Sequence, residues 1–151
     1  RIAWANQGAY CASKYAVEAF SESLAQEVAP FGIRVAIVEP GVTASAIFDN
    51  TPVHYDRASP YKSAMRRNGR FYNVGTAVAT PAEEVAEVIA GALTTDQPRL
   101  RYPVGFGSQA MARRAAMNDE EFVALATLDD PDYYQALRDN LDLELEPPRN
   151  E

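Results

Sequence analysis

Apolar residues between Ala9 and Val28 recur at the spacing of a helix. They follow one another at intervals of three or four residues and place on one face Val17, Phe20, Leu24 and Val28. The opposite face carries Glu18, Ser21 and Glu22. Pro30 and Gly32 follow, and both residue types are typical of a helix end. The pattern predicts an amphipathic helix from Ala9 to Val28.

The next apolar run is short and continuous. Residues 35–38 read Val-Ala-Ile-Val and lead into Glu39-Pro40-Gly41, as expected of a parallel strand that is buried on both faces. Helix, tight turn and buried strand form half of a right-handed crossover unit, and ligands of such sheets bind beyond the carboxyl ends of the strands. The turn at Pro40 and Gly41 therefore lies at the expected ligand edge, where a glycine lets backbone approach a ligand closely.

Residues 46–78 have no clear period. They include two prolines and several aromatic residues, and a connection of this length inside a compact domain usually forms a lid or a binding loop. Within it, Tyr61 to Arg70 is predicted to form a short helix that carries Lys62, Arg66 and Arg67. These cations either meet an acidic substrate or form a solvated helix face, and we favour the solvated face.

Residues 80–104 predict a helix followed by a strand. Thr80, Pro81 and Glu83 have the pattern of a capped helix start, and the apolar face of this helix consists of Val85, Val88, Ile89 and Ala92. Residues 100–104 then alternate and include Pro103. Because proline cannot donate to a ladder, we expect an edge strand there.

Three further helices are predicted after residue 107. Ser108 is expected to cap the first and Asn118 the second, and the third spans Asp132 to Leu141 with an apolar side of Tyr133, Tyr134 and Leu137. The end of the chain, residues 143–148, reads Leu-Glu-Leu-Glu-Pro-Pro. We predict that this end is disordered.

Composition narrows the possible functions. The 151 residues are 47% hydrophobic, which is enough for the core of one domain. The formal net charge is −7, so nucleic-acid binding has no electrostatic support. There is no apolar run long enough to cross a bilayer and no signal peptide pattern. We therefore expect neither a nucleic-acid partner nor a membrane span.

Cys11 and His54 are the single cysteine and the single histidine. One cysteine cannot form an internal disulfide and fits a reducing compartment, so a cytoplasmic protein is expected. His54 lies far from Cys11 in a loop-like segment, which argues against a catalytic Cys/His pair. We interpret Cys11 as a small buried apolar residue, and no metal site is expected.

Tyr10 and Lys14 are four residues apart and share one face of the first predicted helix. An ammonium group beside a phenol favours the ionised phenol, and the partial positive charge of a first helical turn acts in the same direction. Such a pair can give a proton to a carbonyl oxygen or take one from an alcohol. Tyr-x-x-x-Lys is also common on ordinary helix surfaces, so the pair alone leaves both interpretations open.

The residues around this pair resemble the short-chain dehydrogenase/reductase family. The resemblance begins with Gly8-Ala9-Tyr10-Cys11-Ala12-Ser13-Lys14-Tyr15-Ala16-Val17 and continues through residues 30–35 and Glu39-Pro40-Gly41-Val42. It extends over residues 80–86 and 100–105, in the order and spacing of the family, and so covers residues 1–107. Several separate matches in one order are a far more specific signal than any one motif.

This resemblance implies an α/β fold, the C-terminal half of a doubly wound Rossmann-like parallel sheet over residues 1–107. Residues 46–79 are then a helical substrate-loop insertion, and residues 108–151 form a helical C-terminal extension. The implied function is an oxidoreductase that transfers hydride between NAD or NADP and a secondary alcohol or ketone. The aromatic loop favours an apolar small-molecule substrate. Family members commonly pair through the first helix, so a homo-oligomer is expected, with the outer face Tyr15, Ala19 and Ser23 in contact.

By the same resemblance, Tyr10 is the catalytic acid/base. Lys14 favours its ionised form and also holds the nicotinamide ribose, so both residues contact the cofactor. The turn at Pro40 and Gly41 borders the cofactor, and the backbone at Val42 meets the nicotinamide carboxamide.

The remaining site residues are less closely defined. The family usually has a threonine four residues after the glycine; here that position is Ser45 and Thr43 lies two residues earlier, so either hydroxyl can serve. Substrate contacts are expected from Trp4, Gln7 and Phe48. Trp4 can instead simply pack on the core.

The catalytic serine and the Gly-rich cofactor turn of the family have no counterpart in these residues. We therefore expect a fragment of a longer protein that by itself neither binds a dinucleotide tightly nor turns over. An alternative is a family member that kept the fold and acts as a binding or regulatory protein, although the presence of both Tyr10 and Lys14 argues against it. A helical interaction module without redox chemistry would fit only the C-terminal helices.

Overall fold

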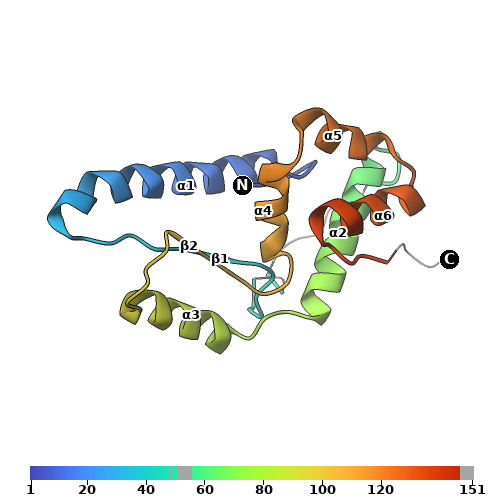
Figure 1. Cartoon of the computed structure of the whole chain (residues 1–151). Coiled ribbons are helices and arrows are strands. Elements are labelled where there is room, and N and C mark those ends of the chain that lie inside the picture. Colours follow the sequence, from blue (N-terminus) through green and yellow to red (C-terminus); the bar gives the residue numbers. More distant parts are fainter. Residues whose placement is uncertain (48, 51–55, 147–151) are drawn as a thin grey trace.

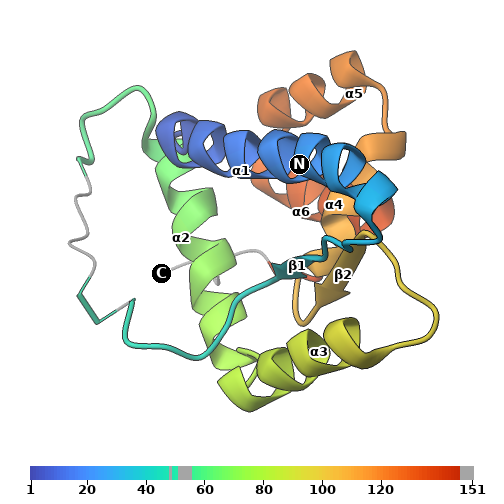
Figure 2. The ribbon, with the colours of Figure 1, turned by 90° about the vertical axis from the view of Figure 1, so that its left-hand side faces the viewer.

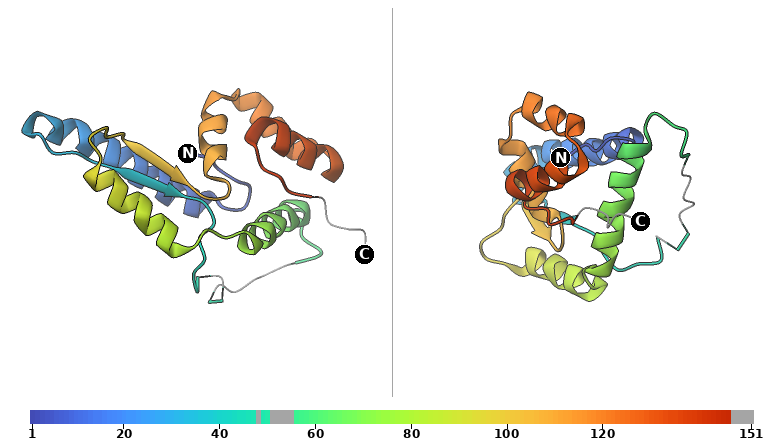
Figure 3. Two further views of the ribbon diagram at one scale, coloured as in Figure 1. Left: turned by 60° about the horizontal axis from the view of Figure 1, so that its bottom comes forward. Right: turned by 90° about the vertical axis from the view of Figure 1, so that its right-hand side faces the viewer.

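Two parallel strands lie between helices at one end of the molecule, and more helices gather at the other end. The computed structural model describes residues 1–47, 49–50 and 56–146. Helix α1 (Gly8–Val28) covers one side of the strands and α3 (Ala82–Thr94) covers the other (Figures 1 and 2). Figure 3 shows the second group beside this layered unit: α2 (Lys62–Ala77), α4 (Ser108–Ala116), α5 (Asp119–Ala124) and α6 (Asp130–Leu141).

Helix α1 confirms the helix predicted from the apolar period and begins one residue earlier than expected. A short 3-10 helix, Ala29–Phe31, follows it. The chain then reverses at Gly32, whose φ of 70° is in the left-handed region that favours glycine. The apolar stripe is only partly covered by the residues described: Val17 is 58% exposed and Phe20 is 69% exposed.

The predicted strands are present with shifted bounds. Strand β1 (Ile37–Pro40) pairs in parallel with β2 (Arg101–Val104), so that Pro40 lies opposite Val104. Burial along β1 alternates, because Ile37 and Glu39 are buried and Pro40 is exposed. The expectation of a strand starting at residue 35 and buried on both faces is therefore wrong for the chain as described.

Two of the three predicted helix caps are wrong. Thr80 does not cap α3, whose N-cap is Pro81, and Thr80 is instead buried against Gly105. Ser108 is the first residue of α4, and its hydroxyl donates to the Gly105 carbonyl at 2.8 Å. Asn118 caps α5 as predicted, since its Oδ1 accepts from the backbone N–H of Glu120 at 2.8 Å.

The helix predicted at residues 61–70 is longer than expected. Helix α2 continues to Ala77 because its later turns carry apolar residues that pack on the core, among them Phe71 and Val74. Near its end, Gly75 is buried against Val42; a Cβ on Gly75 would lie 2.6 Å from the Val42 Cγ2 atom. The last turns of α2 therefore pack directly on the turn that follows β1.

The C-terminal helices and the segment after them form the main hydrophobic core. Its buried members are Ala110, Leu125, Tyr134, Leu137, Leu141, Leu143 and Leu145. Leu143 is 1% exposed and Leu145 is 2% exposed, so the prediction of disorder is wrong for these residues. The Glu146 carbonyl also accepts from the Arg70 Nε atom at 2.7 Å. Residues 147 and 148, included in that prediction, lie outside the described residues.

Candidate active site

Tyr10 and Lys14 share one face at the start of α1. The Lys14 Nζ atom lies 5.6 Å from the centroid of the Tyr10 ring, and the Tyr10 side chain is 59% exposed. Cys11, between them in sequence, is buried as a free thiol, as expected for a small apolar residue. The helical spacing thus presents the phenol and the ammonium group together at the surface and turns the thiol inward.

Trp4 packs on the core in the way that the second interpretation of this residue anticipated. Its ring centroid lies 6.2 Å from that of Phe71 and 5.9 Å from that of Phe122. The segment that contains Trp4 turns sharply before α1: the Gln7 N–H donates to the Trp4 carbonyl at 3.2 Å. Asn6 within this turn has a φ of 63°, a conformation that asparagine tolerates better than most residues.

Gln7 contacts a residue that the sequence did not single out as a site residue. Its Nε2 atom donates to the hydroxyl oxygen of Tyr72 at 2.9 Å, across 65 residues of sequence. Asn68, one turn earlier in α2, donates from Nδ2 to the Ala5 carbonyl at 2.7 Å. The sequence showed Tyr72 only as one of many aromatic residues in the loop, because spacing along the chain does not reveal a partner this distant.

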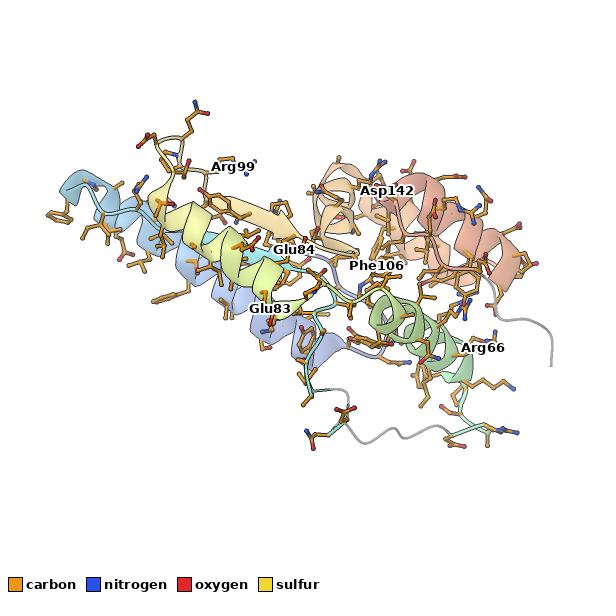
Figure 4. The ribbon with its side chains drawn as sticks, turned by 90° about the horizontal axis from the view of Figure 1, so that it is seen from below. Arg66, Glu83, Glu84, Arg99, Phe106 and Asp142 are labelled. Atoms are coloured by element: carbon orange, nitrogen blue, oxygen red, sulfur yellow. The ribbon has the colours of Figure 1, made fainter. Side chains whose placement is uncertain are left out.

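Position 41 requires a glycine because the backbone of Phe106 passes close to it. A Cβ on this residue would lie 1.8 Å from the Phe106 carbonyl oxygen, and the Gly41 N–H donates to the Val104 carbonyl at 2.9 Å. Figure 4 shows Phe106 between the strands on one side and α2 and α4 on the other. The backbone that approaches Gly41 closely is therefore the turn after β2.

Both backbone hydrogen-bonding groups of Val42 have partners within the chain. Its N–H donates to the Phe106 carbonyl at 3.3 Å, and its carbonyl accepts from the Thr80 N–H at 2.9 Å. The Thr80 carbonyl accepts from the Ala44 N–H at 2.9 Å, which makes a parallel bridge between Thr43 and Thr80. In this pattern the peptide groups of Thr43 itself point away from Thr80.

The other predicted residues of this edge have different surroundings. Pro40 and Ser45 are exposed, and Thr43 is half-buried with its hydroxyl 3.4 Å from the Gly41 carbonyl. Phe48, expected at the substrate, lies outside the described residues. The backbone groups of Val42, predicted to meet the nicotinamide carboxamide, are thus engaged within the chain.

A network of charges ties α1 to the two strands. The Arg101 guanidinium lies 3.0 Å from a Glu18 carboxylate oxygen on α1 and 3.6 Å from the buried carboxylate of Glu39 on β1. Arg1 also contacts Glu39, at 3.2 Å. Partial burial of Arg101 acts to lower its pKa, but hydrogen bonds and charge attraction to Glu18 and Glu22 together outweigh burial and raise the pKa. Because α1 is fixed to the sheet in this way, Tyr10 has a defined position relative to the end of β1.

The solvated face predicted for the cations of α2 is present in part: Lys62 and Arg66 are exposed, whereas Arg67 is buried. Arg67 is buried and its Nε atom lies 3.0 Å from an Asp130 carboxylate oxygen, while Arg66 contacts the other oxygen at 2.5 Å. Of the three, Lys62 is the one that makes no ion pair among the described residues. Arg66 and Arg67 are thus both paired with Asp130 of α6.

A cleft of about 500 Å³ is lined by Arg1, Tyr15, Arg114, Ala115, Met117, Asn118, Asp119 and Glu120. It includes neither Tyr10 nor Lys14. Over the described residues, no helix is both long and apolar enough to span a membrane. Nor does that part of the chain hold a group of three or more His, Cys, Asp or Glu side chains that could bind a metal.

Comparison with known proteins identifies the family. The family model described as enoyl-(acyl carrier protein) reductase matches residues 1–95. A solved short-chain dehydrogenase from Streptomyces avermitilis is 30% identical, has a TM-score of 0.61, and is matched over 84% of this chain and 48% of that chain. The chain belongs to the short-chain dehydrogenase/reductase family. The predicted fold class, part of a Rossmann-like α/β sheet, is thereby confirmed.

Curated members of the short-chain dehydrogenase/reductase family match to a similar extent. An uncharacterized oxidoreductase of Schizosaccharomyces pombe is 34% identical over 118 residues, which are 76% of this chain and 49% of that protein. Mouse (Mus musculus) retinol dehydrogenase 5 is 35% identical over 74% of this chain and 39% of its own length. Human (Homo sapiens) 17-beta-hydroxysteroid dehydrogenase type 6 is 30% identical over 68% of this chain and 36% of its own length. The chain thus spans half or less of the length of these relatives.

Proposed function

We propose that this chain carries the acid/base half of a nicotinamide-dependent oxidoreductase that interconverts a secondary alcohol and a ketone. The observation that supports this most directly is the exposed Tyr10–Lys14 pair on α1, with the Lys14 ammonium group 5.6 Å from the Tyr10 ring. A phenol placed in this way can donate its proton to a carbonyl oxygen and recover it from an alcohol. Membership of an oxidoreductase family makes this chemistry the one to test first.

The residues at the end of β1 suit the nicotinamide end of NAD or NADP. When bound, this cofactor supplies or accepts the hydride at the substrate carbon. Lys14 would hold the ribose through its ammonium group. The peptide groups of Thr43, which point away from Thr80, would hold the carboxamide, and the exposed hydroxyl of Ser45 lies two residues further along. Pro40, Gly41 and Val42 would shape this edge without donating to the cofactor.

An apolar alcohol or ketone is the proposed substrate class. Helix α2 brings Phe71 and Tyr72 to the side of Gln7, close to the start of α1. Similar proteins named as retinol and 17-beta-hydroxysteroid dehydrogenases support a substrate of this kind.

We also propose that α1 contributes to a homo-oligomer. Its outer face carries Tyr15 and Ala19, both exposed in the chain as described, and a two-fold interface would bring each copy of this face against its equivalent. Sedimentation of the protein at micromolar concentration tests this, and a monomer would contradict it.

Tyr10→Phe tests the acid/base assignment. The protein is expressed from the whole reading frame that encodes this chain. Its reduction of a panel of ketones is then measured with NADH and with NADPH. The phenyl ring keeps the packing and lacks the proton, so kcat should fall by at least about 100-fold while the cofactor Kd stays close to wild type. A variant that kept more than about a tenth of the rate would refute the assignment. Cofactor binding without any turnover by the wild-type protein would favour a binding or regulatory role.

A further inference from the structure

The hydrogen bond between Gln7 and Tyr72 places a second phenol next to the proposed acid/base. Gln7 is the residue just before α1, and its carbonyl accepts from the Cys11 N–H at 2.8 Å. Tyr10 follows Gln7 by three residues, which is less than one helical turn. Since the Gln7 amide donates to Tyr72 at 2.9 Å, the Tyr72 hydroxyl is held beside the first turn of α1, the turn that carries Tyr10.

Several contacts fix the wall that carries Tyr72. The Asn68 amide donates to the Ala5 carbonyl at 2.7 Å, and the Phe71 ring lies 6.2 Å from the Trp4 ring. Helix α2 is therefore bound to the segment before α1 at three successive places, from residue 68 to residue 72. A side chain supported in this way keeps one position, as a residue that orients a substrate must.

The electrostatic surroundings keep Tyr72 neutral. Partial burial raises its pKa above the ordinary value, the hydrogen bond from Gln7 opposes this, and the neighbouring Tyr10 and Cys11 raise it further. A phenol with a raised pKa stays protonated at neutral pH and is a poor general base. Its hydroxyl can both donate and accept hydrogen bonds. Tyr72 therefore suits the recognition of a neutral oxygen group and not a second acid/base role.

We propose that Tyr72, held by Gln7, is a positioning residue that binds a second oxygen of the substrate, a hydroxyl or carbonyl group close to the carbon that reacts at Tyr10. The preferred substrates are then otherwise apolar hydroxyketones, diketones and the corresponding diols. This inference rests on the proposed oxidoreductase function and adds the polar group that the substrate carries. It gives a role to the hydrogen bond between Gln7 and Tyr72, which lies next to the aromatic contact of Trp4 with Phe71.

The test compares two matched probe pairs: 2-hydroxyacetophenone with acetophenone, and 2-hydroxycyclohexanone with cyclohexanone. The measured quantity is the ratio of kcat/KM for the hydroxyketone to kcat/KM for the simple ketone. Tyr72→Phe keeps the ring and removes the hydroxyl, so this ratio should fall about tenfold, mainly through KM. Gln7→Leu should lower the same ratio, and the double variant should lose no more than Tyr72→Phe alone because both changes remove one contact.

Tyr61→Phe is the matched control, because Tyr61 is an exposed tyrosine just before α2; its ratio should equal that of the wild type. Thermal unfolding of each variant detects a loss of folding. Such a loss would lower kcat/KM for both ketones of a pair together. If the wild type reduces the ketones and Tyr72→Phe leaves the ratio within about twofold, this inference is wrong and the proposed function stands. If no probe is reduced in a Tyr10-dependent reaction, the proposed function fails and the inference fails with it.

Discussion

The guanidinium of Arg67 and the carboxylate of Asp130 form an ion pair that joins α2 to α6 away from solvent. Nε lies 3.0 Å from Oδ1, and the Arg67 side chain is only 9% exposed. The guanidinium also donates to the carbonyls of Ala126 and Leu128 and lies 3.9 Å from the centroid of the Tyr133 ring. This one side chain therefore satisfies several acceptors that would otherwise lose their partners.

Replacing Arg67 by methionine should destabilise the protein strongly. The change leaves a partly buried carboxylate and two backbone carbonyls without this donor, and removing one partner of a buried pair costs about 3–5 kcal/mol. The lower end is expected, since Arg66 still contacts Asp130. Urea unfolding measures the loss. Lys62→Met on the exposed side of the same helix is the control and should change stability by less than about 0.5 kcal/mol.

Lys14→Met should reduce both turnover and cofactor binding. The ammonium group is proposed to act on Tyr10 and on the cofactor ribose, so we expect kcat/KM to fall about 100-fold and the cofactor Kd to rise. Steady-state kinetics and a fluorescence titration measure the two effects. Lys62→Met again serves as the control for loss of a lysine. A Lys14 variant with kcat/KM within about threefold of wild type would count against the proposed site.

Gly41→Ala and Gly69→Ala should have opposite effects on stability. A Cβ at Gly41 would lie 1.8 Å from the Phe106 carbonyl oxygen, so the strand turn must move; at Gly69 in α2 a Cβ meets nothing within 4 Å. Gly41→Ala should cost about 2 kcal/mol or more. Gly69→Ala should stabilise by about 0.5–1 kcal/mol, because alanine favours the helix interior. Equal effects in urea unfolding would contradict the close approach at Gly41.

Tyr134→Phe should leave stability unchanged or raise it. Tyr134 is 1% exposed, and its hydroxyl has no hydrogen-bond partner among the described residues. Removing a buried group that lacks a partner also removes its desolvation cost, about 1–3 kcal/mol. Tyr102→Phe is the matched control, since the Tyr102 hydroxyl accepts from the Arg99 N–H at 2.9 Å. This variant should lose about 1 kcal/mol of stability. A comparable loss for Tyr134→Phe would indicate a bound water at that hydroxyl.

Stability should decline above about pH 10 because buried tyrosines resist ionisation. Burial raises the pKa of Tyr133, with Arg67 opposing it, and burial likewise raises the pKa of Tyr134. The tyrosines therefore lose their protons at a lower pH in the unfolded chain than in the folded protein. Their contribution to stability is complete below the pKa of the unfolded state and is lost as the pH rises through the pKa of the folded state. Urea unfolding from about pH 8 to about pH 11 measures the slope. Tyr134→Phe should flatten it, and the exposed Tyr61→Phe should not.

The sequence predicted those features that depend on neighbours along the chain. The apolar period of α1, the cap at Asn118 and the presence of two strands all follow from local patterns. Thr80 and Ser108 failed as caps because tertiary contacts with the turn at Gly105 recruit them instead. The local pattern at the C-terminus could not show that Leu143 and Leu145 meet a core formed by distant helices.

The site divides in the same way. Tyr10 and Lys14 come together because four residues span one helical turn, so the sequence could place them. The contacts of Gln7 with Tyr72 and of Arg67 with Asp130 join residues more than sixty positions apart. The length and aromatic content of residues 46–78 predicted a binding loop, and only the fold determines which distant residues these side chains contact.

The bridge between Thr43 and Thr80 joins the two ends of the segment that we propose to bind the substrate. Two hydrogen bonds hold the ends of this segment together, from the Ala44 N–H to the Thr80 carbonyl and from the Thr80 N–H to the Val42 carbonyl. Both are made by backbone groups outside the segment's interior, so they do not depend on the residues in between. The segment should therefore be exchangeable for one from another protein. A segment of different length costs only about 0.6 kcal/mol of loop-closure free energy for each doubling of its length. A donor segment must still supply an arginine that pairs with Asp130 of α6. Grafts with such an arginine are the ones that should fold and acquire a new substrate range.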